Sequence, residues 1–266
     1  AISIEQGRAA FERVWGVPLP REPGLNLLQM MDAAEAGGLK MLWAIGYDIL
    51  LTNANAAATR RALANLELLV VSDLFLNETA REYAHVFLPA ASSFKKDGTF
   101  MNAERRVQRV RRALAPPGEA RSDWETVRNV AAALGHGAHF TFSSAEAIWN
   151  EIRVVWPQAA GMTYARLDRG GLQWPCPDEQ HPGTTILHRD TFPVGPRAAL
   201  RRIDYHATPE AVSPEYPFRL MTGRTLYQFN AGTMTQRTPN RVLRPTDTLH
   251  LQANGHSGTA IGALWG

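Results

Sequence analysis

Apolar and polar residues alternate between helix-like and strand-like patterns over positions 1–156. Apolar residues before Gly37 recur at the spacing of one helix face, which predicts a helix. This helix is expected to end at Gly37, because glycine commonly follows the last turn. The alanine- and arginine-rich segment Asn53–Asn65 predicts a second helix. Short apolar runs predict buried strands over Met41–Ile45, Leu66–Val71 and His85–Ala90.

Two Ser-x-x-Glu sequences predict further helix starts, because the serine and glutamate side chains can cap the first turn reciprocally. The first is Ser122–Glu125, whose helix is expected to end at Gly135, and the second is Ser143–Glu146, whose helix is expected to run to Pro157. Strands that alternate with helices at this spacing predict an α/β fold with a mainly parallel sheet and flanking helices.

Prolines change the pattern after Pro157. Nine of the 17 prolines fall in the 61 residues from Pro157 to Pro217, where long helices and central strands are disfavoured. We therefore expect residues 157–216 to form a Pro-rich connector that lies on the surface. The pattern becomes β-like again in residues 217–266, with apolar runs at Phe218–Met221 and Thr248–Leu251.

Composition restricts the kinds of site that the chain can carry. One cysteine excludes an internal disulfide, an all-cysteine iron–sulfur site and a thiolate zinc site within these residues. That cysteine, Cys176, is expected to be an inert structural thiol, and His136 and His139 lack the neighbours of a metal site. No apolar run approaches the ~20 residues of a membrane span, and the N-terminus is not a signal peptide, so we predict a cytoplasmic protein.

The first candidate site follows the predicted strands. Gly46, Asp48 and Thr52 come after the first strand, and Ser72 and Asp73 follow the second. Ligands in open α/β sheets bind beyond the carboxyl ends of the strands. The alternative is that Asp48 caps a helix and the others are ordinary loop residues. Neither a G-x-G-x-x-G nor a P-loop sequence is present.

Asp123 is the second candidate, since it directly follows the helix cap at Ser122. A carboxylate can accept both the N1–H and the exocyclic amine of guanine, which adenine does not offer. The alternative is a favourable interaction of this aspartate with the helix dipole.

The basic segment Lys95–Arg112 is the third candidate. It holds seven basic residues against two acidic ones, which suits phosphate or nucleic acid, but it lacks interleaved aromatic residues. A solvated or interdomain face is the alternative, and we expect no nucleic-acid partner.

A fourth candidate is a polar, glycine-containing stretch after the 218–221 run. Its glycines let a backbone approach a ligand, and its side chains can donate to phosphate or pterin-like heteroatoms. A long β-hairpin connection is the alternative. The candidate residues are Thr222, Gly223, Arg224, Thr225, Gln228, Asn230, Gly232 and Thr233.

Several motifs in order resemble the molybdopterin oxidoreductases of the dimethyl-sulfoxide-reductase family, most closely the catalytic subunits of NAD-dependent molybdenum formate dehydrogenases. The resemblance rests on eight short motifs: Gly46–Leu50, Asp73–Ala80, Tyr83–Pro89, Asp97–Phe100, Asn102–Arg106, Gln173–Pro177, Thr222–Arg224 and Gly232–Thr235. The sequence departs from the family at Tyr47 and Met101 and in the tail after Leu251.

The resemblance implies a bis-(molybdopterin guanine dinucleotide) cofactor with molybdenum or tungsten. Residues 1–156 would then be an incomplete guanine-dinucleotide-binding domain, and residues 217–266 the first strands of a β-barrel domain. Motif matching places Asp48, Thr52, Ser72 and Asp123 on cofactor-contacting positions of the former domain, and Gly46 and Asp73 are expected to bind the cofactor with them. Motif matching also places Arg224, Thr225, Gln228 and Asn230 on those of the opening loop of the barrel, and the other four candidates from Thr222 to Thr233 are expected to bind there too.

The resemblance also implies a function that needs more chain than is present. The metal ligand and the iron–sulfur segment of the family lie upstream, so the chain looks like a fragment and is predicted to be inactive alone. Its expected partners are the rest of its own catalytic subunit and diaphorase-type electron-transfer subunits, in an enzyme that oxidises formate. The alternative is a stand-alone non-catalytic module that binds the cofactor or a partner.

Overall fold

The computed structural model describes residues 4–197, 199–209, 211–217, 222–246, 249–251 and 260–262. The predicted strand at 218–221 lies outside these residues. The chain divides into two compact units. The first unit comprises Ala1–Leu27, Ser72–Phe75 and Leu88–Ala198, and the second comprises Leu28–Val71, Leu76–Phe87 and Ala199–Gly266.

A three-stranded sheet has the order β1-β2-β3, with β1 at Met41–Ile45, β2 at Leu68–Asp73 and β3 at Val86–Pro89. His85 N donates to Leu69 O, and Ala90 N donates to Asp73 O further along both segments. The partners advance in the same direction, so β2 and β3 are parallel. A parallel bridge between Ala90 and Arg121 extends the sheet beyond β3. These features confirm the predicted α/β fold.

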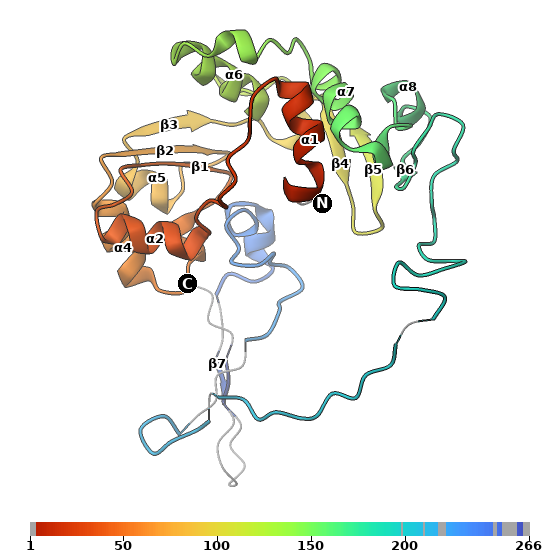
Figure 1. Cartoon of the computed structure of the whole chain (residues 1–266). Coiled ribbons are helices and arrows are strands. Elements are labelled where there is room, and N and C mark those ends of the chain that lie inside the picture. Colours follow the sequence, from red (N-terminus) through yellow and green to blue (C-terminus); the bar gives the residue numbers. More distant parts are fainter. Residues whose placement is uncertain are drawn as a thin grey trace. The chain divides into compact units, whose positions relative to one another are not determined.

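Four helices lie around this sheet, as Figure 1 shows for α2, α4 and α5. They are α2 (Leu27–Glu35), α3 (Ile49–Thr52), α4 (Ala56–Ala64) and α5 (Glu78–Tyr83). The side chains of Asp48, Asn55 and Asn77 cap the first turns of α3, α4 and α5. The sequence pattern predicted α2 and α4 but missed α3 and α5, because a helix of one or two turns is too short to show a period.

The core of the second unit lies between the sheet and these helices. Leu69 and Val71 of β2 are fully buried, and the neighbouring positions of that strand are buried as well. A central parallel strand is covered on both faces, so its sequence is continuously apolar rather than alternating. Met31, Ile49 and Leu63 complete this core from the helices.

The first unit contains an antiparallel sheet of order β4-β5-β6, formed by Gly98–Met101, Arg106–Val110 and Leu172–Gln173. The basic segment Lys95–Arg112 is therefore largely a hairpin, in which Thr99 pairs with Arg109. The helices of this unit are α1 (Ile4–Trp15), α6 (Asp123–Ala133), α7 (Ala145–Val155) and α8 (Tyr164–Leu167).

Helices α6 and α7 begin near their predicted starts. Glu125 accepts a hydrogen bond from Ser122 N in the capping box of α6, as expected. The N-cap of α7 is Ser144 rather than Ser143, because the Ser144 hydroxyl accepts the Ala147 N–H at 3.1 Å. Trp15 at the end of α1 donates its indole N–H to Glu151 of α7.

The Pro-rich segment does not lie wholly on the surface. Cys176, Met162 and Ala159 are fully buried and pack with Trp149 of α7 in a second apolar core. The exposed part of the segment begins later, where Leu200 and Ile203 are 100% and 90% exposed. The expectation of a surface connector is therefore wrong for its first part, which turns back onto α7.

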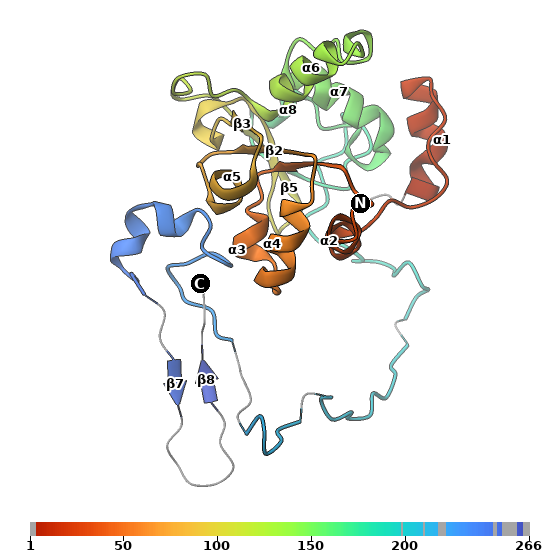
Figure 2. The same cartoon turned by 90° about the vertical axis from the view of Figure 1, so that its left-hand side faces the viewer.

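The C-terminal segment carries short 3-10 turns and one strand pair. The turns there are η4 (Thr235–Arg237) and η5 (Pro239–Val242). Strands β7 (Leu249–Leu251) and β8 (Ala260–Gly262) pair antiparallel, side by side in Figure 2. Among the described residues this pair does not close into a barrel. The 3-10 turns of the first unit are η1 (Ser93–Lys95), η2 (Gly137–His139) and η3 (Pro157–Ala159).

Within the described ranges, no helix is both long and apolar enough to cross a membrane.

Candidate functional site

Asp48 is a buried carboxylate at the start of α3, with 2% of its surface exposed. Its Oδ1 atom accepts the Thr79 hydroxyl at 2.6 Å and the Leu51 N–H at 3.4 Å. The capping alternative that the sequence left open is therefore realised. The second oxygen, Oδ2, is also buried and has no hydrogen-bond partner among the described residues.

Thr79 connects α5 to α3. Its hydroxyl donates to Asp48 and accepts the Leu50 N–H at 2.9 Å, and the residue is fully buried. Buried polar groups are costly unless they are hydrogen-bonded. The threonine thereby satisfies two buried groups of the α3 turn and fixes the direction of the Asp48 carboxylate.

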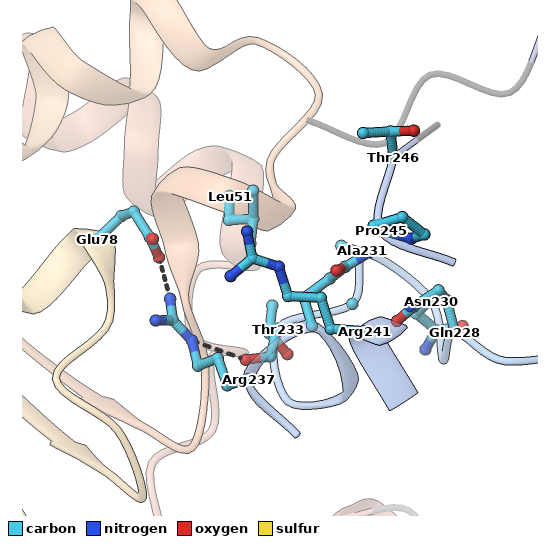
Figure 3. Close-up of a pocket in the computed structure, with 12 residues that line it drawn as sticks. Leu51, Glu78, Gln228, Asn230, Ala231, Thr233, Arg237, Arg241, Pro245 and Thr246 are labelled. Carbon is cyan, nitrogen blue, oxygen red and sulfur yellow. Dashed lines mark hydrogen bonds and ion pairs between the residues drawn. The ribbon is translucent and has the colours of Figure 1, made fainter. Parts of the chain in front are cut away.

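Arg237 brings the C-terminal segment to these helices. Its guanidinium forms an ion pair with Glu78 at the start of α5, and its Nη2 lies 3.9 Å from Asp48 Oδ2. The Nε–H donates to the Thr233 carbonyl at 3.1 Å, as Figure 3 shows. One arginine therefore contacts two acidic groups and the backbone of the polar loop.

The polar loop folds by bonding its own side chains. Gln228 is 7% exposed; its Oε1 accepts the Thr235 hydroxyl at 2.5 Å, and its amide donates to the Arg244 carbonyl at 3.4 Å. Gly232 has a φ of +71°, and a Cβ there would lie 2.8 Å from the Gln236 side chain. The turn therefore requires glycine at this position. Asn230 also has a positive φ, +51°.

A cavity of about 590 Å³ opens between this loop and the helices of the second unit (Figure 3). Glu78, Arg237 and Arg241 supply its charged groups. Arg241 has no acidic partner among the described residues. The predicted site residues that line this cavity are Gln228, Asn230, Gly232 and Thr233.

A second cavity of about 600 Å³ shares Leu51, Glu78 and Ala231 with the first. It contains Thr52 and Thr222, two predicted site residues that come from opposite ends of the sequence. Six of the predicted residues therefore line these two cavities of the second unit, and the buried Asp48 lies close to Arg237 of the first cavity.

The remaining residues of the predicted loop sites do not line these cavities. Gly46 turns the chain after β1 with a φ of +61°. Gly223 and Arg224 are exposed, and Arg224 donates to Asn230 at 3.4 Å. Thr225 has a buried hydroxyl oxygen with no hydrogen-bond partner among the described residues.

Ser72, Asp73 and Asp123 belong to the first unit. Ser72 is 3% exposed, and the Asp73 carboxylate accepts the Leu74 N–H at 2.6 Å. Asp123 is the first residue of α6 and forms an ion pair with Lys96, with 41% of its side chain exposed. The carboxylate is accessible to a ligand and also lies at the helix N-terminus, where negative charge is favoured.

Sequence reasoning missed four residues of this arrangement: Glu78, Thr79, Arg237 and Arg241. Glu78 and Arg237 are separated by 159 positions, so no local pattern connects them. Thr79 lies in a short helix that showed no apolar period. The only available signal was position: Glu78 and Thr79 lie within the motif Asp73–Ala80, and the two arginines follow the motif that ends at Thr235.

Comparison with known proteins identifies a domain in the first half of the chain. Residues 7–133 match the model of the molybdopterin oxidoreductases. The chain is 43% identical over 241 residues to the F420-dependent formate dehydrogenase subunit alpha of Methanocaldococcus jannaschii. The alignment covers 90% of this chain and 35% of that protein. It is 36% identical over 250 residues to the assimilatory nitrate reductase catalytic subunit of Bacillus subtilis, with 90% and 35% covered.

A solved structure shares the fold. The acetylene hydratase of Pelobacter acetylenicus aligns with a TM-score of 0.65 and 21% identity, over 94% of this chain and 37% of that chain. Residues 7–133 therefore form a molybdopterin oxidoreductase domain, and formate dehydrogenase alpha subunits are among the relatives of the chain. It spans about 35% of the length of the curated relatives that it matches.

Proposed function

We propose that this chain is part of the catalytic subunit of a formate-dehydrogenase-like oxidoreductase and that it binds the bis-(molybdopterin guanine dinucleotide) cofactor. The family supports a molybdopterin cofactor. The formate dehydrogenase relatives at about 40% identity support the substrate class. A cytoplasmic location and diaphorase-type electron-transfer partners are part of the same proposal, and so are a molybdenum or tungsten centre and iron–sulfur clusters elsewhere in the subunit.

The cavity of the second unit is the observation that carries the proposal. Its volume of about 590 Å³ lies within the usual range of small-molecule sites. Two arginines in its lining, Arg237 and Arg241, suit the diphosphate of a dinucleotide, since guanidinium groups bind phosphate oxygens in pairs. Arg241 is the better candidate because it is not already neutralised by a carboxylate.

Buried polar atoms without hydrogen-bond partners also fit a polar ligand. Asp48 Oδ2 and Thr225 Oγ1 are both buried, and neither has a hydrogen-bond partner in the part of the chain that the structure describes. Both residues fall on positions that the family resemblance assigns to the cofactor. When bound, the cofactor would supply redox chemistry at its metal; the residues of this chain would hold and orient its nucleotide ends.

Asp123 would read the guanine in this proposal. Its accessible carboxylate can accept two parallel hydrogen bonds from the base, and Lys96 would then have to release or share it. Because the Asp123 side chain is 41% exposed and its described side-chain contact is a single pair with Lys96, its removal should affect ligand binding more than folding.

The cofactor part of the proposal is tested by mass spectrometry of the denatured chain after expression in a host that makes the cofactor. Guanine dinucleotide should be released from the wild-type chain and reduced at least tenfold in Asp123→Ala and Arg241→Gln, as expected for losing a charged contact. Asp190→Ala is the control, since Asp190 is an exposed acidic residue that is not among the candidate site residues. Wild-type protein without any guanine dinucleotide would contradict the assignment.

The substrate part needs a separate assay, because a nitrate reductase catalytic subunit is also a relative. We expect the 266-residue chain alone to oxidise no formate. A longer subunit that includes it should oxidise formate and leave nitrate unreduced. Nitrate reduction by that subunit would refute the formate assignment while leaving cofactor binding intact, and a cofactor-loaded chain that joins no larger enzyme would favour a non-catalytic module.

A further inference from the structure

Met101 is an exposed methionine at the end of β4, with 55% of its surface accessible. It lies between two of the motifs that resemble the molybdopterin oxidoreductases, and it is one of the positions at which this sequence departs from their pattern. The proposed cofactor site does not use it, so the proposed function leaves this side chain unexplained.

The sulfur of Met101 accepts a hydrogen bond. The indole Nε1–H of Trp174 donates to the Met101 Sδ atom, with 2.9 Å between nitrogen and sulfur. Indole nitrogen is a donor only and thioether sulfur is a weak acceptor, so Trp174 is necessarily the donor. The sheet explains the contact (Figure 1): Met101 pairs with Val107 of β5, and β6 pairs with the other edge of β5 immediately before Trp174.

Neighbouring side chains hold the indole of Trp174 in place. The Arg105 guanidinium lies 5.6 Å from the centre of the Trp174 ring and also donates to the Trp174 carbonyl. The Trp156 ring meets it edge to face, with 5.8 Å between the ring centres and 67° between the planes. Both kinds of contact favour particular ring orientations. The indole N–H therefore keeps a fixed direction toward the sulfur.

The other exposed methionines lack such a donor. Met41 and Met234 are 48% and 51% exposed, close to the value for Met101. Neither sulfur accepts a hydrogen bond in the part of the chain that the structure describes. Met31 and Met162 are 7% and 0% exposed, so burial protects them from reagents in solution. Met41 and Met234 are therefore matched reference sites for Met101.

An exposed thioether reacts with hydroperoxides. A sulfur lone pair attacks the terminal peroxide oxygen, and the S–O bond forms as the O–O bond breaks. The proton of the attacked oxygen passes through water to the departing oxygen, which leaves as water or an alcohol. The sulfur is oxidised, the hydroperoxide is reduced, and the side chain becomes a methionine sulfoxide. The new group is chiral at sulfur, so it exists as two epimers.

We propose that Met101 is a stereoselective site of reversible oxidation, at which a hydroperoxide forms one sulfoxide epimer in excess. The Trp174 N–H occupies one of the two sulfur lone pairs, so the other lone pair attacks the peroxide and receives the oxygen. The lone pair that accepts the hydrogen bond is not consumed, and the contact with Trp174 is kept in the product. A methionine sulfoxide reductase of the class specific for that epimer then restores the thioether.

The test is peroxide treatment of the folded 266-residue chain, followed by tryptic digestion. Trypsin releases Met101 in the peptide 97–105, Met41 in 41–60 and Met234 in 225–237, so mass spectrometry follows each sulfoxide separately. The peptides are then incubated with each of the two epimer-specific classes of reductase in turn. The fractions of Met101 sulfoxide that the two classes remove should differ about fivefold, as expected for one hydrogen bond. Both classes should remove similar fractions at Met41 and Met234.

Two variants isolate the role of the indole N–H. Trp174→Phe keeps an aromatic ring and removes the donor, so it should give the two Met101 epimers in nearly equal amounts. Trp15→Phe is the matched control and should keep the selectivity, because the Trp15 indole N–H donates to Glu151 instead. Circular dichroism checks that both variants fold.

A second measurement needs no substitution. Wild-type chain oxidised in urea has lost the contact between Trp174 and Met101, so its peptide 97–105 should carry both epimers equally. This experiment decides the question even where Trp174→Phe does not fold.

Equal amounts of the two epimers at Met101 in the folded wild-type chain would overturn the proposal. The same selectivity in urea, or in a folded Trp174→Phe variant, would overturn it as well. Reversibility is tested by incubating the oxidised, folded chain with the reductase class that prefers the Met101 epimer. Unmodified peptide 97–105 should reappear, and its absence would refute the reversible part. Each of these outcomes is independent of cofactor binding, and so of the proposed function.

Discussion

The buried pair of Asp48 and Thr79 shows how chemistry is arranged at the scale of single residues. The sequence placed Asp48 correctly beyond a strand end but left its role open between capping and binding. The structure shows a carboxylate that caps α3 with one oxygen and keeps the other buried near Arg237. Thr79, which holds it, could not be predicted because its partner lies 31 positions away.

Replacing Thr79 by valine should destabilise the second unit by about 1–3 kcal/mol, since it leaves Asp48 and the Leu50 N–H without their shared hydroxyl. Thr79→Ser keeps the hydroxyl and should lose less. Denaturant unfolding of the two variants measures the difference. Equal stability of Thr79→Val and wild type would show that the hydroxyl contributes no net stabilisation.

Tyr164 predicts a pH dependence at alkaline pH. Its pKa in the folded chain is raised by burial above the ordinary value of 10.0, so the folded state holds this proton more tightly than the unfolded state. Stability from this group is therefore complete below the unfolded pKa and is lost as pH rises through the folded pKa. Unfolding measured between about pH 8 and about pH 11 should show a smaller loss for Tyr164→Phe than for wild type. A loss of equal size in both would contradict the assignment to Tyr164.

At the scale of helices and strands, the sequence predicted the bounds best where a capping residue or a continuous apolar run marks them. The strand Met41–Ile45 was predicted at its observed bounds, and the helix before Gly135 was identified from its capping box. The sheet strand after Asn65 begins two residues later than predicted and reaches Asp73. Short helices and the β4–β5 hairpin were missed, because polar and charged residues on their exposed faces obscure the period.

The start of α7 provides a test in two adjacent serines. Ser144→Ala removes the acceptor of the Ala147 N–H and should cost about 1 kcal/mol. Ser143→Ala, at the exposed neighbouring position, should change stability by less than about 0.5 kcal/mol. Chemical denaturation monitored by circular dichroism compares the two. A larger loss of stability for Ser143→Ala would show that Ser143 is the N-cap of α7, as the sequence pattern predicted.

At the scale of the whole molecule, the Pro-rich segment has two different parts. Its first part is buried against α7, where Arg166 donates to the carbonyls of Gly161, Asp178 and His181. Its later part, around Leu200 and Ile203, makes no core. Proline content alone does not distinguish these two, because prolines also occur in tightly packed irregular chain.

Limited trypsin digestion should therefore cut first at Arg201 or Arg202, between two almost fully exposed residues. Arg153 should resist, since its guanidinium is held by the Ala160 carbonyl and its side chain is only 18% exposed. Mass spectrometry of early digestion products identifies the sites. Early cleavage at Arg153 would show that the first unit is less stable than its burial indicates.

The sequence by itself determined the α/β pattern, the parallel strands, the main capped helices and the resemblance to the molybdopterin oxidoreductases. These features are encoded locally, in periodicity, in capping residues and in the order of short motifs. Only the tertiary structure decided which residues share a cavity. Thr52 and Thr222 line one cavity, Arg237 pairs with Glu78, and the Arg109 guanidinium lies over the Tyr164 ring, although each pair comes from segments far apart in the chain. Such contacts depend on packing across the whole fold, for which a local pattern carries no signal.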